Sequence, residues 1–197
     1  MLLRSRILAK KHRSRAIHAP KNTVKYLLFT LTSAVLSINM AFAALPELLP
    51  QAQASAAVRL RVWGFSIYDA KLWVQRGFKA ENFEQQRFGL ELKYLRNLKK
   101  DDIAQRSITE MRRFTAISDA KAANWLARMT ASFPDVQDGD TLVGINQPGV
   151  GASFYMNGKL LGEVNDPEFA KLFFSIWLHP NSSQPAMRNA MLGSLPQ

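Results

Sequence analysis

The chain contains no cysteine and only three histidines in 197 residues. The absence of cysteine excludes disulfide bonds, thiol nucleophiles, thiolate metal ligands and lipid attachment to an N-terminal cysteine. His12 and His18 lie near the N-terminus, which leaves His179 for the rest of the chain. One histidine excludes a histidine cluster as a metal site and argues against a serine-histidine-aspartate triad. We therefore predict no metal site and no cofactor.

Acidic residues are missing from the first 46 positions, although the whole chain carries a formal net charge of +11. Eight of the 26 lysines and arginines lie within residues 1–43. The remaining 18 basic and 15 acidic residues leave a net charge of +3 outside this segment. Because affinity for nucleic acid comes largely from cations that neutralise phosphates, this small charge argues against a nucleic-acid partner.

The N-terminal segment has the three parts of a secretory signal. A basic start precedes an apolar core over residues 26–38, and small residues stand on both sides of Phe42 as a cleavage site. We expect residues 1–43 to be a signal peptide that is cleaved after Ala43, and the protein to be periplasmic or secreted. The alternative is an uncleaved membrane anchor, since the apolar stretch approaches the roughly 18 to 20 residues that span a bilayer.

The chain beyond the signal is long enough for one domain of about 150 residues. Residues 44–55, ALPELLPQAQAS, are rich in alanine, glutamine and proline and predict a flexible tether. We expect the folded domain to span residues 56–197.

A hairpin followed by a helix is the strongest local signal. Asn157 and Gly158 separate two alternating apolar runs, and both tolerate the positive φ angles of a two-residue type I′ turn. Asp166 is a suitable helix cap, with Pro167 at the first helical position. The apolar residues that follow fall on one helical face: Phe169, Leu172, Phe173, Ile176 and Trp177.

The remaining pattern predicts strands first and helices second. Alternating or β-branched runs around Gly64, over residues 88–95 and over residues 141–147 indicate strands. Asp101 or Asp102 is expected to cap one helix, and Ser118 the next. Strands, two helices, a strand meander and two further helices indicate an α+β domain, with helices on one face of a largely antiparallel sheet.

Several segments, in this order, resemble the chalcone isomerase-like family, specifically its bacterial secreted branch. They are Arg61 before GFSIYDAKLWV, then LELKYLRNLKKDDIAQRS, DGDTL, MNGKLLGEVNDPEFAKLFFSIWL and MRNAMLG. Together they cover nearly all of residues 56–193. The resemblance implies an open-faced β-sandwich of the chalcone isomerase type, in which a large antiparallel sheet carries a layer of helices and a ligand cleft lies between them.

The resemblance also implies a chemistry, in which a phenolate oxygen adds to an unsaturated ketone. The plant enzymes of the family use an arginine, a threonine, a tyrosine and an asparagine for this step. Arg61 matches the arginine, whereas Tyr68 stands at the threonine position, and Ala104 and Met111 stand near the tyrosine and asparagine positions. Two hydrogen-bond donors are then missing, and each oxyanion donor is typically worth about 100 to 1,000-fold in rate.

These departures favour binding over catalysis. Like the family members that bind fatty acids, the chain is expected to bind a small hydrophobic or amphipathic ligand with an anionic head. The candidate ligand-binding residues are Arg61, Tyr68, Ser107, Met111 and Arg112, and no catalytic residue is assigned.

Two other functions stay open. One is an isomerase or intramolecular lyase that acts on an enone with Tyr68 as proton donor, and the other is an envelope protein that binds a partner protein. Arg61 also fits a cross-strand ion pair, and Tyr68 a packing role in the sheet.

Overall fold

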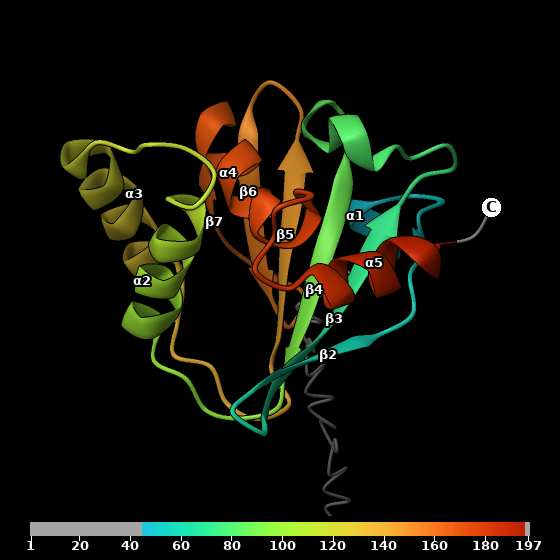
Figure 1. The fold of residues 1–197 in the computed structure, drawn as a ribbon, viewed down its shortest axis with the longest axis horizontal. Coiled ribbons are helices and arrows are strands. Elements are labelled where there is room, and N and C mark those ends of the chain that lie inside the picture. Colours follow the sequence, from blue (N-terminus) through green and yellow to red (C-terminus); the bar gives the residue numbers. More distant parts are fainter. Residues whose placement is uncertain (1–44, 196–197) are drawn as a thin grey trace, which may run out of the picture. The chain divides into compact units, whose positions relative to one another are not determined.

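The centre of the fold is a seven-stranded antiparallel sheet, seen in a computed structural model that describes residues 45–195 (Figure 1). The short strand β1 (Gln53–Ala54) and then β2 (Val58–Val62) pair with the same edge of β3. The other strands follow across the sheet in chain order: β3 (Phe65–Val74), β4 (Phe88–Tyr94), β5 (Thr141–Gln147), β6 (Gly151–Met156) and β7 (Lys159–Val164). The predicted signal peptide and its cleavage site lie outside the described residues.

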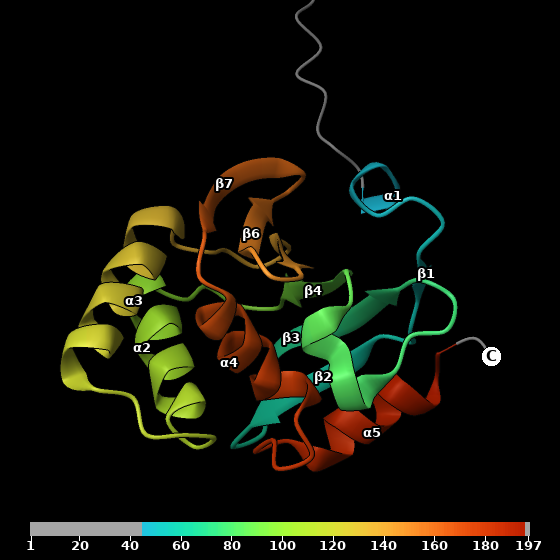
Figure 2. The same cartoon turned by 90° about the horizontal axis from the view of Figure 1, so that it is seen from above.

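Four longer helices accompany the sheet: α2 (Lys100–Met111), α3 (Asp119–Ser132), α4 (Pro167–Leu178) and α5 (Pro185–Gly193). A 3₁₀ helix, η1 (Ala80–Gln85), joins β3 to β4, and one turn of helix, α1 (Leu45–Leu48), precedes the first strand. Figure 2 shows α1 on the opposite side of the sheet from α4 and α5. No helix within residues 45–195 combines the length and the apolar character needed to cross a bilayer. The predicted fold class, a large antiparallel sheet with a layer of helices, is confirmed.

The β6–β7 hairpin forms as predicted. Asn157 and Gly158 have φ angles of 49° and 82°, and Met156 pairs with Lys159 across the turn. Both turn residues therefore have the positive φ of a type I′ turn, which asparagine and glycine adopt at low cost.

The helix that follows is capped by Asp166, also as predicted. Its carboxylate accepts hydrogen bonds from the backbone N–H groups of Glu168 and Phe169 at 3.0 and 3.1 Å. The second carboxylate oxygen accepts a hydrogen bond from the indole N–H of Trp125 in α3 at 2.8 Å. One side chain thus starts α4 and ties it to α3.

Phenylalanine rings fill the layer between α4 and the sheet. Phe154 of β6 is fully buried, and its ring centroid lies 4.9 Å from that of Phe133 and 5.2 Å from that of Phe173. Phe88 of β4 meets Phe174 of α4 at 4.8 Å. These contacts are edge-on, the geometry that aromatic pairs favour, and they fix α4 against β4 and β6.

The cap predicted for α2 is wrong. The helix begins at Lys100, after Lys99 in an extended conformation, and neither Asp101 nor Asp102 caps it. Asp135, from the segment after α3, accepts a hydrogen bond from the backbone N–H of Lys100 at 3.0 Å instead. A cap from a distant residue leaves no local sequence signal.

The flexible tether predicted for residues 44–55 is also wrong over its described part, residues 45–55. Leu49 is 1% exposed and packs with Val143 and Ile145 of β5 on the face of the sheet away from α4. Gln53 and Ala54 form β1. The leucines of this segment cover an apolar patch of the outer sheet face, so the folded domain starts about ten residues earlier than expected.

Candidate functional site

A cavity of about 590 Å³ lies between the sheet and the helices. Its apolar wall comes mainly from the sheet and α4: Leu60, Val62, Ile67, Leu92, Leu142, Phe173, Ile176 and Trp177. Trp63 lines it at an exposed rim, since this side chain is 94% exposed. The volume is within the range of about 300 to 1,000 Å³ that is usual for small-molecule sites.

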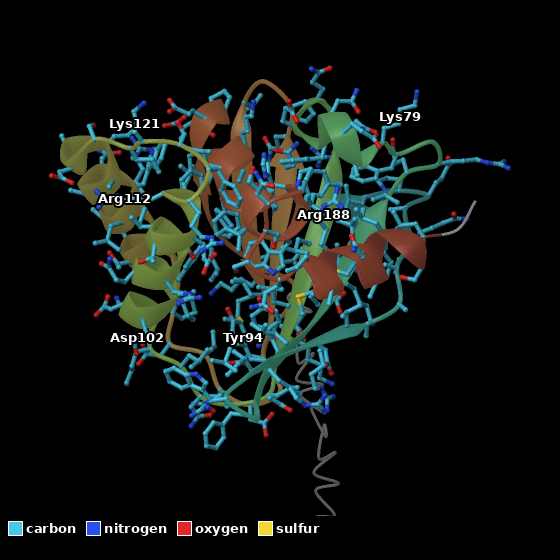
Figure 3. The ribbon with its side chains drawn as sticks, in the orientation of Figure 1. Lys79, Tyr94, Asp102, Arg112, Lys121 and Arg188 are labelled. Carbon is cyan, nitrogen blue, oxygen red and sulfur yellow. The ribbon has the colours of Figure 1, made fainter. Side chains whose placement is uncertain are left out.

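The second wall is polar and belongs to α2. Asp102, Ile103, Arg106, Ser107 and Glu110 line the cavity at spacings of one, three and four residues, which place them along one stripe of the helix. Figure 3 shows Asp102 and Arg112 at opposite ends of α2, with Tyr94 nearer the end that carries Asp102. The cavity therefore has an apolar face on the sheet and α4, and a charged face on α2.

Two tyrosines of neighbouring strands face the cavity together. Tyr68 and Tyr94 are cross-strand partners, and their rings meet edge-on at 6.0 Å. The hydroxyl oxygen of Tyr68 accepts a hydrogen bond from the indole N–H of Trp177 at 3.0 Å. Burial raises the pKa of both hydroxyls far above the usual value, so both stay protonated at neutral pH. They can donate hydrogen bonds to a ligand but cannot act as bases.

Arg106 and Glu110 form an ion pair at the edge of the cavity. One guanidinium nitrogen of Arg106 lies 2.6 Å from Oε1 of Glu110, four residues later. The Glu110 side chain is 7% exposed, and its Oε2 has no hydrogen-bond partner among the described residues. Arg113 approaches Oε2 only to 3.5 Å. Oε2 is therefore covered by protein atoms, with Arg113 as its ion-pair neighbour, and does not present itself to the open cavity.

The structure brings two of the five predicted binding residues to the cavity. Tyr68 and Ser107 line it, although the Ser107 hydroxyl donates to the backbone oxygen of Ile103 at 2.8 Å. Met111 is fully buried but is not part of the lining, and Arg112 pairs with Asp119 at 2.7 Å instead.

Arg61, the fifth predicted residue, is exposed and is not part of the lining either. Its charge acts on Asp69, whose carboxylate is held by two hydrogen bonds of 2.8 Å from Arg59. The Arg59 hydrogen bonds, more than the charge of Arg61, lower the pKa of Asp69. Asp69 follows Tyr68 in β3, and successive strand residues point to opposite faces, so this cluster lies on the face away from the cavity. The expectation that Arg61 lines the cleft is wrong.

Arg106, Glu110 and Tyr94 were not among the predicted site residues. A signal for the first two is present in the sequence, because Ile103, Arg106, Ser107 and Glu110 repeat at helical spacing. Charged residues at two of these four positions are typical of a solvent-facing stripe. Only the packing of α2 against α3 and α4 turns that stripe towards a cavity.

The arrangement can hold a molecule with an apolar body and a polar head. The apolar wall would take the body, while Arg106 and the two tyrosine hydroxyls offer one cation and two donors. The described residues contain no group of three or more histidine, aspartate or glutamate side chains that could hold a metal ion.

Comparison with known proteins agrees with this architecture. A sequence model of the family described as chalcone isomerase-like matches residues 54–193. An uncharacterized protein of Haemophilus influenzae is 31% identical over 132 residues, which are 66% of this chain and 63% of that protein. The chain thus spans slightly less than two thirds of this relative.

The crystal structure of an Arabidopsis thaliana fatty-acid binding protein has a similar fold. It superposes with a TM-score of 0.56 over 73% of this chain and 87% of that chain, at 10% sequence identity. At this identity the likeness concerns the fold.

Proposed function

The chain belongs to the chalcone isomerase-like family, and on that premise we propose that its cavity binds a small hydrophobic or amphipathic ligand of the fatty-acid type without converting it. The observation that carries the proposal is the pairing of an apolar wall on the sheet and α4 with a polar stripe on α2. Pockets with one apolar and one polar wall bind the apolar part of a ligand by burying its hydrophobic surface, and they orient the ligand through a few polar groups. The binding of fatty acid by a plant protein of the same fold supports the choice of ligand class.

Arg106 is the cation available to a carboxylate head, with Tyr68 and Tyr94 as hydrogen-bond donors beside it. Glu110 competes for that cation, because its carboxylate already lies 2.6 Å from the guanidinium. An acyl carboxylate would either displace Glu110 from Arg106 or leave Glu110 in place. A hydroxyl head carries no charge and would leave the Arg106–Glu110 pair in place. Palmitate and hexadecanol, which share a chain length and differ in the head, distinguish these cases.

The test measures the binding of both probes by calorimetry. Arg106→Gln is expected to weaken palmitate binding about tenfold or more, since a hydrogen bond to a charged group is worth about 1.5–3 kcal/mol. Arg112→Gln is the matched control, because it removes the arginine directly after the same helix, which is paired to Asp119 outside the cavity. Its palmitate affinity should change less than twofold. Glu110→Gln, which removes the competing carboxylate from Arg106, should tighten palmitate binding and leave hexadecanol binding nearly unchanged. If the unaltered protein binds neither probe, the proposal fails.

One observation favours a second function, an intramolecular lyase or isomerase acting on an enone. The Tyr68 hydroxyl faces the cavity and its oxygen accepts from Trp177, which leaves its hydrogen to be donated to an enolate. Turnover of a chalcone-like enone that is lost in Tyr68→Phe would establish this function, and absence of turnover in the unaltered protein would exclude it for that substrate.

The proposed location is the periplasm or the exterior of the cell, on the strength of the signal-like residues 1–43. N-terminal sequencing of the exported protein should find Ala44 as its first residue.

A further inference from the structure

The turn between β2 and β3 carries an unusual residue. Val62 pairs with Phe65, so Trp63 and Gly64 form a two-residue turn, with φ angles of 49° and 83°. These angles nearly equal those of the asparagine-glycine turn between β6 and β7, where asparagine tolerates them well. Tryptophan has no such tolerance, and its left-handed backbone is a strained state of the kind that collects at functional sites.

Packing does not account for Trp63, because its side chain is 94% exposed. Phe65 is 63% exposed and Val62 is 39% exposed, so three of the four residues of this hairpin tip present apolar side chains to solvent. Single exposed apolar residues are common, but two aromatic rings on one tip are a concentrated patch. We call Val62, Trp63 and Phe65 the aromatic tip.

Arginines flank the aromatic tip. The guanidinium carbon of Arg96 lies 5.4 Å from the ring centroid of Phe65, and Arg61 directly precedes the tip. Neither arginine takes part in an ion pair within the described residues. The two segments that meet here, residues 58–68 and 92–100, contain no acidic residue.

The neighbouring turn before β5 does carry three aspartates. Asp135 pairs with Lys99, and Asp140 accepts hydrogen bonds from the side chain of Asn157 and the backbone of Gln137. Asp138 is the third. The charged side chain that lies over Phe65 is the cation Arg96, and the cation Arg61 adjoins the tip in the sequence, so the tip favours an anionic partner.

We propose that the aromatic tip docks on an anionic phospholipid bilayer, with Trp63 and Phe65 at the level of the headgroups and with Arg61 and Arg96 beside the phosphates. Tryptophan is the residue that prefers this interface, and each arginine near an anionic surface adds attraction. A protein partner fits less well: a stable interface takes about 800 Å² from each side, whereas two aromatic side chains and a valine supply well under that area.

Because the aromatic tip lies at the rim of the cavity, its docking would also affect the cavity. Val62 and Trp63 also line the cavity, so a docked protein would turn this rim towards the bilayer. An acyl chain could then pass between membrane and cavity without crossing water. This consequence rests on the proposed function, whereas the docking itself requires no ligand.

The test uses the full-length protein and vesicles that contain phosphatidylglycerol and brominated phosphatidylcholine, which quench nearby tryptophan fluorescence. Residues 1–43 carry eight cations of their own, so sedimentation with vesicles would not isolate the tip, whereas quenching reports the depth of the tryptophans. The central variant is Trp63→Asn, which recreates the asparagine-glycine turn of the other hairpin and is expected to fold at least as well as the parent. Val150→Ser is the control, because it removes a side chain that is 49% exposed in the turn at the opposite end of the sheet.

The parent and Val150→Ser should be quenched equally, and Trp63→Asn should lose this quenching. Arg96→Gln should weaken vesicle binding, measured as quenching against lipid concentration, about fivefold. Vesicles of neutral lipid should quench the parent much less. The proposal is overturned if Trp63→Asn is quenched as strongly as the parent, or if the parent binds vesicles without quenching. Because no acyl ligand is added, a failure here is distinct from a failure of palmitate binding.

Discussion

The layer between the sheet and its helices has a filled end and a hollow end. At the filled end, α4 places phenylalanines against Phe88 and Phe154 of the sheet, and the rings close the space. At the hollow end, α2 presents Arg106, Ser107 and Glu110, which leave about 590 Å³ open. Both ends use the same alternating strands. Because α4 borders both ends, the difference lies in what faces it: phenylalanines of the sheet at the filled end, and the charged stripe of α2 at the hollow end. Aromatic side chains fill an apolar interior, whereas charged ones avoid it.

The largest difference should appear when one large side chain is removed from each end. Phe154→Ala should lower the free energy of unfolding by about 3–5 kcal/mol, because its ring is fully buried among other rings. Ile176→Ala, in the cavity wall, should cost about 2 kcal/mol, since its neighbours are fewer on the hollow side. Urea unfolding measures both, and equal costs would contradict the division into two ends.

A second comparison sets the two faces of the sheet against each other. Leu49→Ala, on the face away from α4, should cost about 2 kcal/mol, the low end for buried leucine, because a single helical turn covers this patch. Leu160→Ala removes a leucine that is 50% exposed and should change stability by less than about 0.5 kcal/mol. If Leu49→Ala were as neutral as this control, residues 45–55 would contribute nothing to the fold.

Within the hollow end, the two tyrosines should differ. Tyr68→Phe leaves the indole N–H of Trp177 without its acceptor and should cost about 1–2 kcal/mol. Tyr94→Phe removes a hydroxyl that makes no hydrogen bond to the described residues, and should cost less than about 0.5 kcal/mol at neutral pH. Thermal unfolding of the two variants checks this order, which a larger cost for Tyr94→Phe would reverse.

The smallest effect concerns alkaline pH. Burial raises the pKa of Tyr94 in the folded state above its ordinary value of 10.0. The folded protein therefore keeps its full stability with respect to this group below pH 10, and loses part of it as the pH rises above 10 and the unfolded chain releases this proton. Half a pH unit above 10, this loss amounts to about 0.8 kcal/mol for one tyrosine. Tyr94→Phe should therefore lose less stability between neutral and alkaline pH than the parent, as unfolding at the two pH values would show. An identical loss of stability in both proteins would mean that the Tyr94 hydroxyl is exposed to water in the folded state.

Local chemistry made the β6–β7 hairpin and α4 predictable. Asn157, Gly158 and Asp166 act within a few residues of themselves, and the phenylalanine stripe of α4 follows from its spacing alone. The hollow end was harder because its features join distant segments. The α2 cap comes from Asp135, and the cavity forms where a polar stripe of α2 meets Tyr68 and Tyr94.

The error at Arg61 has a specific cause. Leu60 pairs with Tyr68 and Arg61 with Ser66, so the extra residue of the bulge, Ile67, lies in β3 and the alternation of β2 is kept. Leu60 and Val62 line the cavity, and Arg61 between them points to the opposite face, as the alternating sequence VRLRV indicates. The family pattern suggested an arginine here, whereas the arginine that reaches the cavity is Arg106 of α2.

The sequence by itself determined the order of strands and helices, the hairpin and cap before α4, the apolar faces that form the core and the family. These properties depend on periods of two and 3.6 residues and on turn chemistry, which act over short stretches of chain. Only the tertiary structure decided which face of α2 lines the cavity, that residues 45–55 cover the outer face of the sheet, and that Arg61 stands outside the cavity while Trp63 stands at its rim. These outcomes depend on packing between segments far apart in the chain, where small shifts in register and helix rotation choose which side chains face inward.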